Sequence, residues 1–218
     1  MRLTKSEAIS KIYNCAVLYQ KNLMGKNVLF IGANENKATG FEAIFLPRNF
    51  QHFTGVGTNL KSSTLFFNAA VNNELSEKDI IITTDGTTEL KLEVLPTLMN
   101  IHVTARMFGD YDNSKSLLVT DKLAGTQTAA MGFVEDKNYF YPNTVLNDDL
   151  RNLTIKPRQR VIAIFVKNQK DKIYNQLTYI PKGMTIDDKI LQTILKQKVD
   201  IDNIEASFII PRLKETTV

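Results

Sequence analysis

The sequence predicts an α+β fold in which helices pack on a mostly antiparallel β-sheet. Apolar residues recur at helical spacing through much of the first half, whereas the second half consists mainly of short extended segments. The change comes after the polar stretch 109–113. A run of helices followed by a run of strands favours an α+β domain with an antiparallel sheet.

A first helix is expected to run towards residue 24, because Thr4 or Ser6 can cap its start and Gly25 stops it. The next segments alternate between extended and helical patterns and are separated by polar turns. Within the last helix of this group, Pro96 is expected to kink the helix or to divide it in two. The predicted segments are strands 27–31 and 41–46 and helices 62–75 and 87–103.

Strands dominate the second half. The segment 160–166 has weak alternation and is expected to lie in the centre of the sheet, covered on both faces. The polar stretch 167–172 is expected to join two strands of a hairpin. The predicted strands are 117–120, 126–134, 139–141, 160–166 and 173–179, and a late helix follows at 185–198.

The length and composition suit one folded unit with appendages. The chain has 218 residues, 43% of them hydrophobic, which suffices for a sizeable core. We expect an N-terminal helix (1–24) packed on a core (25–181), and a C-terminal extension (182–218).

Charge and cysteine usage narrow the classes of partner. The net charge of +4 favours polyanions mildly. The single cysteine, Cys15, excludes an intramolecular disulfide and a multi-thiolate metal site. The N-terminus lacks the apolar run of a signal peptide, and no stretch is long and uncharged enough to span a bilayer, so we expect a cytoplasmic protein without a membrane partner.

The most informative segment is 49–56, which places His52 between Phe50 and Phe53. Imidazole transfers protons near neutral pH, and this chain has only one other histidine, His102, which is expected to be structural. Hydroxyl, amide and basic residues surround His52 in the sequence, a mixture that suits phosphodiester chemistry without a metal. Two interpretations stay open: a site for such chemistry, or a histidine at the edge of the core with its nitrogens satisfied.

Several motifs are missing. The chain has no phosphate-binding P-loop, no dinucleotide-binding glycine pattern and no nucleophile elbow. The carboxylate pairs Asp148–Asp149 and Asp187–Asp188 suit magnesium, but such pairs more often mark a helix start or a turn. We therefore expect no metal site and no cofactor.

Three polar segments are expected at the ends of separate elements, where sheet-based sites are commonly assembled. They are 49–55, 121–128 and 141–151. Together they supply histidine, lysine, threonine, asparagine and arginine side chains.

In their shared order these motifs resemble a known family. They are Phe41-x-Ala43-x-Phe45, Asn49-Phe50-x-His52-x-Thr54-Gly55-Val56, Asp85-Gly86-Thr87-Thr88, Lys91-Leu92-x-Val94-Leu95, Asp121-Lys122-Leu123-Ala124-Gly125, Gly132-Phe133 and Pro142-Asn143-Thr144-Val145-Leu146. The chain resembles the phage-associated Barnase–EndoU–Colicin–RelE-like (BECR) nucleases of phages and bacterial mobile elements, over about residues 25–180. Gln51 and Phe53 stand where that family is expected to have leucine.

The resemblance implies a metal-independent endoribonuclease with a BECR-like fold, in which helices pack on an antiparallel sheet. In such cleavage the ribose 2′-hydroxyl attacks the adjacent phosphorus, so the protein must supply a base, an acid and positive charge. RNA is then the expected partner, in the cytoplasm of a bacterial host cell.

Chemistry suggests a role for each candidate. We expect His52 to act as general base or acid, with Lys122 and Arg151 stabilising phosphate oxygens and Arg48 or Lys61 as substitutes. Hydrogen bonds to phosphate or to the imidazole would come from Thr54, Thr126, Thr128, Asn143 and Thr144. Of these, His52, Lys122, Thr128 and Asn143 form the candidate catalytic set, and Tyr141 or Phe53 is expected to stack on a base.

Alternatives remain for these residues and for the function. Lys122 also suits a solvated turn, Arg151 also suits pairing with Asp148 or Asp149, and the threonines suit ordinary strand or turn positions. A non-catalytic protein on the same fold would bind nucleic acid or a host-defence protein. A toxin would use the same nuclease activity, held in check by an antitoxin protein.

Overall fold

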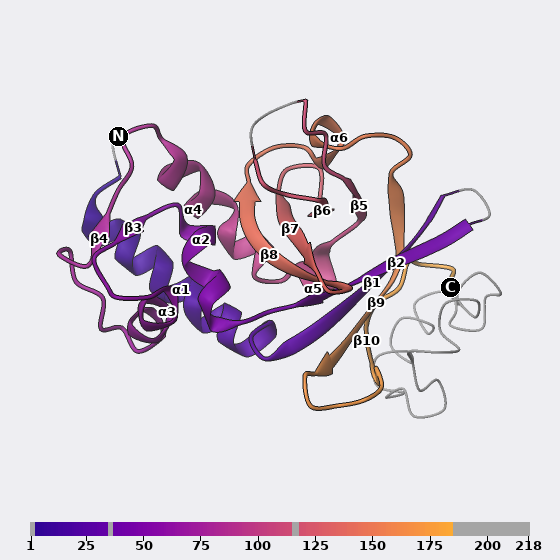
Figure 1. Ribbon diagram of the computed structural model, residues 1–218, viewed down its shortest axis with the longest axis horizontal. Helices are drawn as coiled ribbons and strands as arrows, with labels where there is room; N and C mark the ends of the chain where they lie inside the picture. Colours follow the sequence, from indigo (N-terminus) through magenta and orange to yellow (C-terminus); the bar gives the residue numbers. More distant parts are fainter. Residues whose placement is uncertain (1–2, 35–36, 115–117, 185–218) are drawn as a thin grey trace, which may run out of the picture.

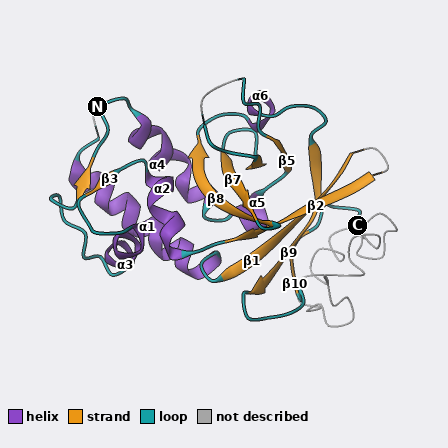
Figure 2. Cartoon of the chain, in the orientation of Figure 1, coloured by secondary structure: helices purple, strands orange, loops and turns teal. Residues whose placement is uncertain are grey.

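The computed structural model describes residues 3–34, 37–114 and 118–184. Over these residues the fold is α+β, as predicted: helices α1 to α4 gather on one side, and a large sheet forms the other (Figures 1 and 2). The helices are α1 Lys5–Asn22, α2 Phe50–Thr54, α3 Ser63–Val71, α4 Thr87–Leu98, α5 Ile101–Thr104 and α6 Leu150–Leu153, with a 3-10 turn, η1, at Pro47–Asn49.

Eight of the strands in the described residues form one sheet in the order β1-β2-β8-β7-β6-β5-β9-β10. They are β1 Lys26–Asn34, β2 Lys37–Ile44, β5 Met107–Asp110, β6 Lys122–Gly125, β7 Ala130–Asp136, β8 Tyr139–Leu146, β9 Gln159–Asn168 and β10 Gln176–Tyr179; a small separate ladder joins β3 Gly57–Thr58 to β4 Ile80–Ile81. The predicted helix 185–198, and with it nearly all of the C-terminal extension, lies outside the described residues.

The large sheet closes on itself. Strand β9 pairs with β1 along one edge, and along the other edge with β5 at its start and β10 towards its end. Every pairing in this ring is antiparallel except that of β2 with β8, which is parallel and rests on the single residue pair Ala43–Phe140. The prediction of a mostly antiparallel sheet is therefore confirmed, and its weakest seam lies between β2 and β8.

The first helix starts where its sequence signals indicate. Thr4 is the N-cap: its side chain accepts a hydrogen bond from the Glu7 amide, and the Glu7 carboxylate accepts one from the Thr4 amide. Inward-facing residues of α1, including Tyr19, belong to the same core cluster as the inner face of the sheet. The Tyr19 ring contacts four phenylalanines, and its hydroxyl donates to the Leu46 carbonyl at 2.8 Å.

A second aromatic group fills the inside of the sheet. The Phe41 ring lies 5.0–5.4 Å, centroid to centroid, from rings on four other strands, those of Phe30, Phe108, Phe133 and Phe140. All five side chains are nearly or fully buried. Because such rings bury large areas and prefer edge-on contacts, this group holds the two sides of the closed sheet together.

Predictions for the middle of the chain need correction. The polar segment 121–128, which was expected at the ends of elements, contains strand β6 at Lys122–Gly125, and Met107–Asp110 forms the unpredicted strand β5. Lys122 is tolerated in a strand because its ammonium pairs with Asp110 on β5. Residues 118–120 are not a strand, and the one expected at 126–134 begins at Ala130. The Thr126 hydroxyl instead accepts hydrogen bonds from the Thr128 and Ala129 amides, which makes a turn.

Two further features concern the helices. The predicted helix does divide, because α4 ends at Leu98 and α5 begins at Ile101, but the break does not fall at Pro96, which lies inside α4. Within the described residues no helix is long and apolar enough to cross a membrane.

We expect Phe41→Ala to lower the free energy of unfolding by about 3–5 kcal/mol, because it removes the ring at the centre of the sheet's aromatic group. Urea unfolding followed by circular dichroism measures the change. Leu90→Ala is the matched control, because Leu90 on α4 is 53% exposed and its loss should cost little. A Phe41→Ala cost no larger than that of the control would contradict this account of the core.

His102, on α5, predicts a loss of stability in acid. Its Nδ1 is buried without a hydrogen-bond partner among the described residues. Burial, and secondarily the charge of Lys26, lowers its pKa from 6.5 to about 4. The unfolded chain therefore binds a proton more readily than the folded one, so this group's penalty grows as the pH falls from 6.5 towards 4 and reaches at most about 3 kcal/mol. Unfolding curves at several pH values should show a shallower acid loss for His102→Gln; identical slopes would refute the assignment.

Candidate functional site

The His52 segment is a short helix held against the core by its aromatic residues. Phe50 and Phe53 are fully buried, whereas His52 faces away from them and is exposed. The preceding turn, η1, is fixed by Asn49, whose side-chain oxygen accepts from the Leu46 amide at 2.9 Å. The imidazole is therefore accessible to solvent, as a site for phosphodiester chemistry requires, although both neighbouring rings lie in the core.

Gly55 ends α2 and brings the helix against the start of α4. Its φ of +68° is left-handed, and a Cβ here would lie 3.0–3.2 Å from atoms of Lys91, Thr88 and Thr87. The buried Thr88 hydroxyl donates to the Gly55 carbonyl at 2.8 Å. The family-like segments 49–56, 85–88 and 91–95 therefore meet at one junction, although they are separate in the sequence.

Lys91 connects this junction to the sheet. Its ammonium donates to the His52 carbonyl and to the Thr144 hydroxyl on β8, both at 3.0 Å. Lys91 is partly buried, and burial lowers its pKa. A lysine has three ammonium hydrogens, so one remains for a ligand. No sequence pattern marked Lys91 as functional beyond its place in a family-like motif.

The environment lowers the pKa of His52. Although the side chain is exposed, the protein around it desolvates part of the imidazole, which is the larger cause, and the nearby charge of Lys91 is the smaller. Both act against the protonated form, so the ring is mainly neutral at pH 7 and able to accept a proton. Arg48 and Tyr141 lie at the same junction: the guanidinium carbon is 5.9 Å from the Tyr141 ring centre, and η1 and α2 both contact β8.

The structure brings together four of the predicted residues and one that was not predicted. Lys91 bonds to the His52 carbonyl and to Thr144, and Arg48 lies beside Tyr141, where η1, α2 and α4 contact β8. We call these five residues the His52 site.

Other candidates lie in the protein interior. Thr54 is fully buried, and its hydroxyl donates to the Gln51 carbonyl at 2.7 Å, so it shapes the end of α2 and has no surface for a substrate. Phe53 is also fully buried, which leaves Tyr141 as the candidate for stacking.

Several predicted cations have partners of their own. Lys122 pairs with Asp110, and its ammonium lies 5.6 Å from the Phe140 ring centre. Arg151 pairs with Asp149 at 2.6 Å, which is the alternative left open for it. Lys61 is exposed in the loop before α3. Ion pairing reduces what Lys122 and Arg151 offer to a phosphate.

Asn143 occupies a bulge in β8, where the register against β7 shifts between Gly132 and Phe133. Its amide donates to the Val119 carbonyl, and its oxygen accepts from the Thr120 hydroxyl at 3.2 Å. Asn143 thus fastens the segment before β6 next to Thr144.

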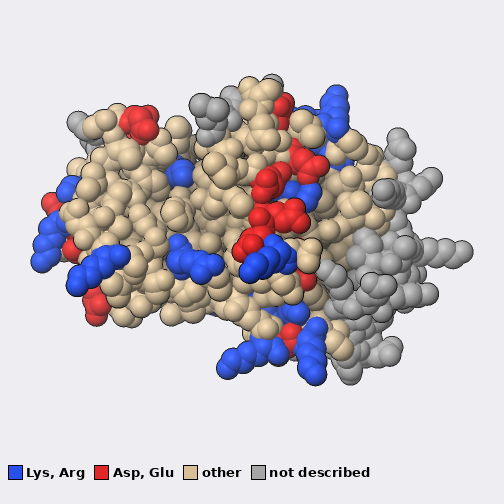
Figure 3. All heavy atoms as spheres, in the orientation of Figure 1, with Lys and Arg blue, Asp and Glu red and all other residues tan. Residues whose placement is uncertain are grey.

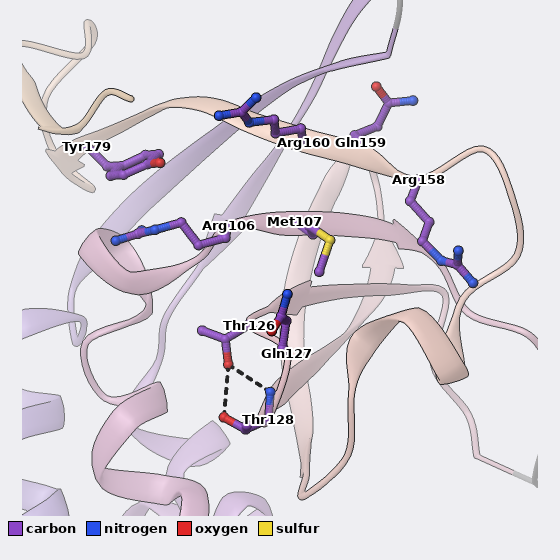
Figure 4. Close-up of a pocket in the computed structure, with 9 residues that line it drawn as sticks. All are labelled: Arg106, Met107, Thr126, Gln127, Thr128, Arg158, Gln159, Arg160 and Tyr179. Atoms are coloured by element: carbon purple, nitrogen blue, oxygen red, sulfur yellow. Dashed lines mark hydrogen bonds between the residues drawn. The ribbon is translucent and has the colours of Figure 1, made fainter. Parts of the chain in front are cut away.

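Thr126 and Thr128 lie in a different place, a pocket of about 730 Å³ (Figure 4). Its other lining residues are Arg106, Met107, Gln127, Arg158, Gln159, Arg160 and Tyr179. Of the proposed catalytic set, only Thr128 lines this pocket, so the four residues do not share it. We call it the arginine pocket. Sequence reasoning missed its arginines because they come from separate elements.

The described residues contain no group of three or more histidine, cysteine, aspartate or glutamate side chains placed to hold a metal ion.

Lys91→Met should raise the pKa of His52 part of the way towards its ordinary value, because the burial that causes most of the shift remains. Titration of the imidazole proton signals by NMR measures it, and His102→Gln assigns the two signals. Lys91→Arg keeps the charge and is the matched control. An unchanged His52 pKa in Lys91→Met would show that the two groups do not interact.

Comparisons with known proteins give a match to a protein family. Searches of curated proteins and of solved structures give no match. A family model described as phage-Barnase-EndoU-ColicinE5/D-RelE like nuclease 4 matches residues 11–183, which include most of α1 and all the segments that meet at the His52 site. The match spans well over half of the chain, and the chain therefore belongs to this family of BECR-like nucleases.

Proposed function

We propose that the protein is a metal-independent endoribonuclease of a phage or bacterial mobile element. The observation that carries the proposal is an exposed histidine of lowered pKa beside a lysine, in a chain that belongs to a nuclease family. RNA is the substrate because its own 2′-hydroxyl can serve as nucleophile, which leaves the protein to supply proton transfer and positive charge.

His52 acts as the general base in this proposal. Its neutral imidazole takes the proton of the 2′-hydroxyl, whose oxygen attacks the adjacent phosphorus. The 5′-oxygen leaves and takes up a proton from water, and the product carries a 2′,3′-cyclic phosphate. The lowered pKa keeps the base unprotonated at neutral pH.

Lys91 and Arg48 replace Lys122 and Arg151 as the cations that stabilise the phosphorane. Neither is engaged in an ion pair among the described residues, in contrast to Lys122 and Arg151. Lys91 is held by two hydrogen bonds, so little reorganisation is needed when charge develops near it. Tyr141 offers its ring to an unpaired base.

A test uses labelled single-stranded RNA in excess chelator. We expect the wild type to release fragments ending in cyclic phosphate. Its activity should rise with pH and reach its plateau before pH 6.5, because the pKa of His52 is lowered from 6.5. His52→Ala should reduce cleavage by about 10²–10⁴-fold, because a positioned base contributes that much.

His102→Gln is the matched control, since His102 lies on α5 away from the His52 site, and its cleavage should equal that of the wild type at pH 7. Circular dichroism shows whether His52→Ala is folded. Equal cleavage by folded His52→Ala and wild type would remove the proposed role of the imidazole.

A non-catalytic binding protein is the second candidate. The ion pairs of Lys122 and Arg151 favour it, because they leave part of the expected cationic machinery occupied. In the same assay a stable RNA complex without products supports binding alone. A toxin role, with an antitoxin or host protein as partner, would appear as growth arrest by the wild type but not by His52→Ala.

A further inference from the structure

The arginine pocket concentrates positive charge away from the His52 site. Three of its nine lining residues are arginines, Arg106, Arg158 and Arg160, and none of the nine is acidic. On the face shown in Figure 3, basic side chains are scattered, and acidic ones gather over the sheet. The lining of the pocket therefore carries positive charge and no negative charge.

Two of the arginines are held in place without losing their charge. One Arg106 terminal nitrogen donates to the carbonyls of Val103 and Ala105 at 2.9 and 3.0 Å. Arg158 donates to the Thr154 hydroxyl and carbonyl at 2.9 and 3.2 Å. Carbonyl and hydroxyl oxygens are neutral, and neither guanidinium forms an ion pair with a described carboxylate, although the charge of Arg158 helps to lower the pKa of Asp149.

The third arginine is the most available. Arg160 is exposed, and its guanidinium makes no hydrogen bond or ion pair with the described residues. Figure 4 shows Arg160 and Arg106 towards Tyr179, Arg158 at the opposite end, and the 126–128 turn across from β9. The exposed Thr128 adds a hydroxyl on that turn.

The shape and chemistry suit a nucleotide strand. A volume of about 730 Å³ lies within the usual 300–1,000 Å³ range of small-molecule sites. Guanidinium groups bind phosphate through paired hydrogen bonds, and cations at both ends of one pocket suit successive phosphates better than a single ion. Arg106 already stacks over Tyr179 at 4.1 Å, which makes a flat surface for an unpaired base.

We infer that the arginine pocket binds the phosphates of single-stranded RNA and so holds the substrate at a second point, apart from the His52 site. This inference rests on the proposed function. In this inference Arg160 and Thr128 help to bind and position the RNA, and they take no part in proton transfer.

The test measures binding of a fluorescent single-stranded RNA to full-length protein carrying His52→Ala, so that the RNA stays intact. Adding Arg160→Gln should raise Kd about tenfold or more and reduce the slope of log Kd against log salt by about 0.7, the value for one lost phosphate contact on a single strand. The Kd of Arg160→Lys should lie between those of the proteins with Arg160 and with Arg160→Gln, because lysine keeps the charge but not the paired hydrogen bonds.

Lys11→Gln on α1 is the matched control: it removes an exposed charge from the helical side and should leave both Kd and slope unchanged. A duplex of the same sequence should bind more weakly than the single strand. An unchanged Kd and slope in Arg160→Gln would overturn the inference, as would equal binding of the duplex or displacement of RNA by millimolar inorganic phosphate.

The two proposals fail in different ways. With His52 restored, Arg160→Gln should raise KM while leaving kcat near that of the wild type. If the wild type cleaves no RNA but the binding results hold, the ribonuclease proposal fails and the pocket stands. If cleavage depends on His52 but not on Arg160 at any RNA concentration, the pocket assignment fails and the ribonuclease stands.

Discussion

An unbroken series of aromatic contacts joins the helices to the sheet, and the position of His52 depends on it. Tyr19 of α1 packs against Phe50 and Phe53, which flank the histidine, and against Phe45 just after β2. Phe45 contacts Phe133 on β7, which contacts Phe41 inside the sheet. Because interiors are close-packed, a change at one end of this series is felt at the other. The imidazole is thus exposed but carried on a rigid base.

The charged groups divide according to the partners they have in the folded chain. Lys122 and Arg151 form ion pairs with carboxylates, whereas Lys91, Arg106 and Arg158 donate to neutral oxygens and form no ion pair among the described residues. A field that attracts a polyanion comes from the second group, because a cation already paired contributes little at a distance. The net charge of +4 does not distinguish the cations in ion pairs from the others, because it counts both groups equally.

Features that depend on neighbouring residues were predictable from the sequence. The Thr4 cap and the helix starting at Thr87 follow from local patterns, whereas the sequence left two interpretations of His52 open. Strand β6 was not predictable, because Lys122 is stabilised there by Asp110, twelve residues earlier. Lys91 and the arginine pocket were missed for the same reason: their partners lie on other elements, and no periodicity encodes such contacts.

Closure of the sheet also determines where the main chain remains open to another polypeptide. A strand with neighbours on both sides has no free amides or carbonyls to offer, so it cannot template the addition of a further strand. Among the described residues, the outer side of β10 and the part of β2 that diverges from β8 chiefly lack such neighbours. The diverging side of β8 is covered by α2 and α4. The part of β8 beyond its single pairing with β2 therefore contacts the helices that carry His52 and Lys91 and is not available to a further strand.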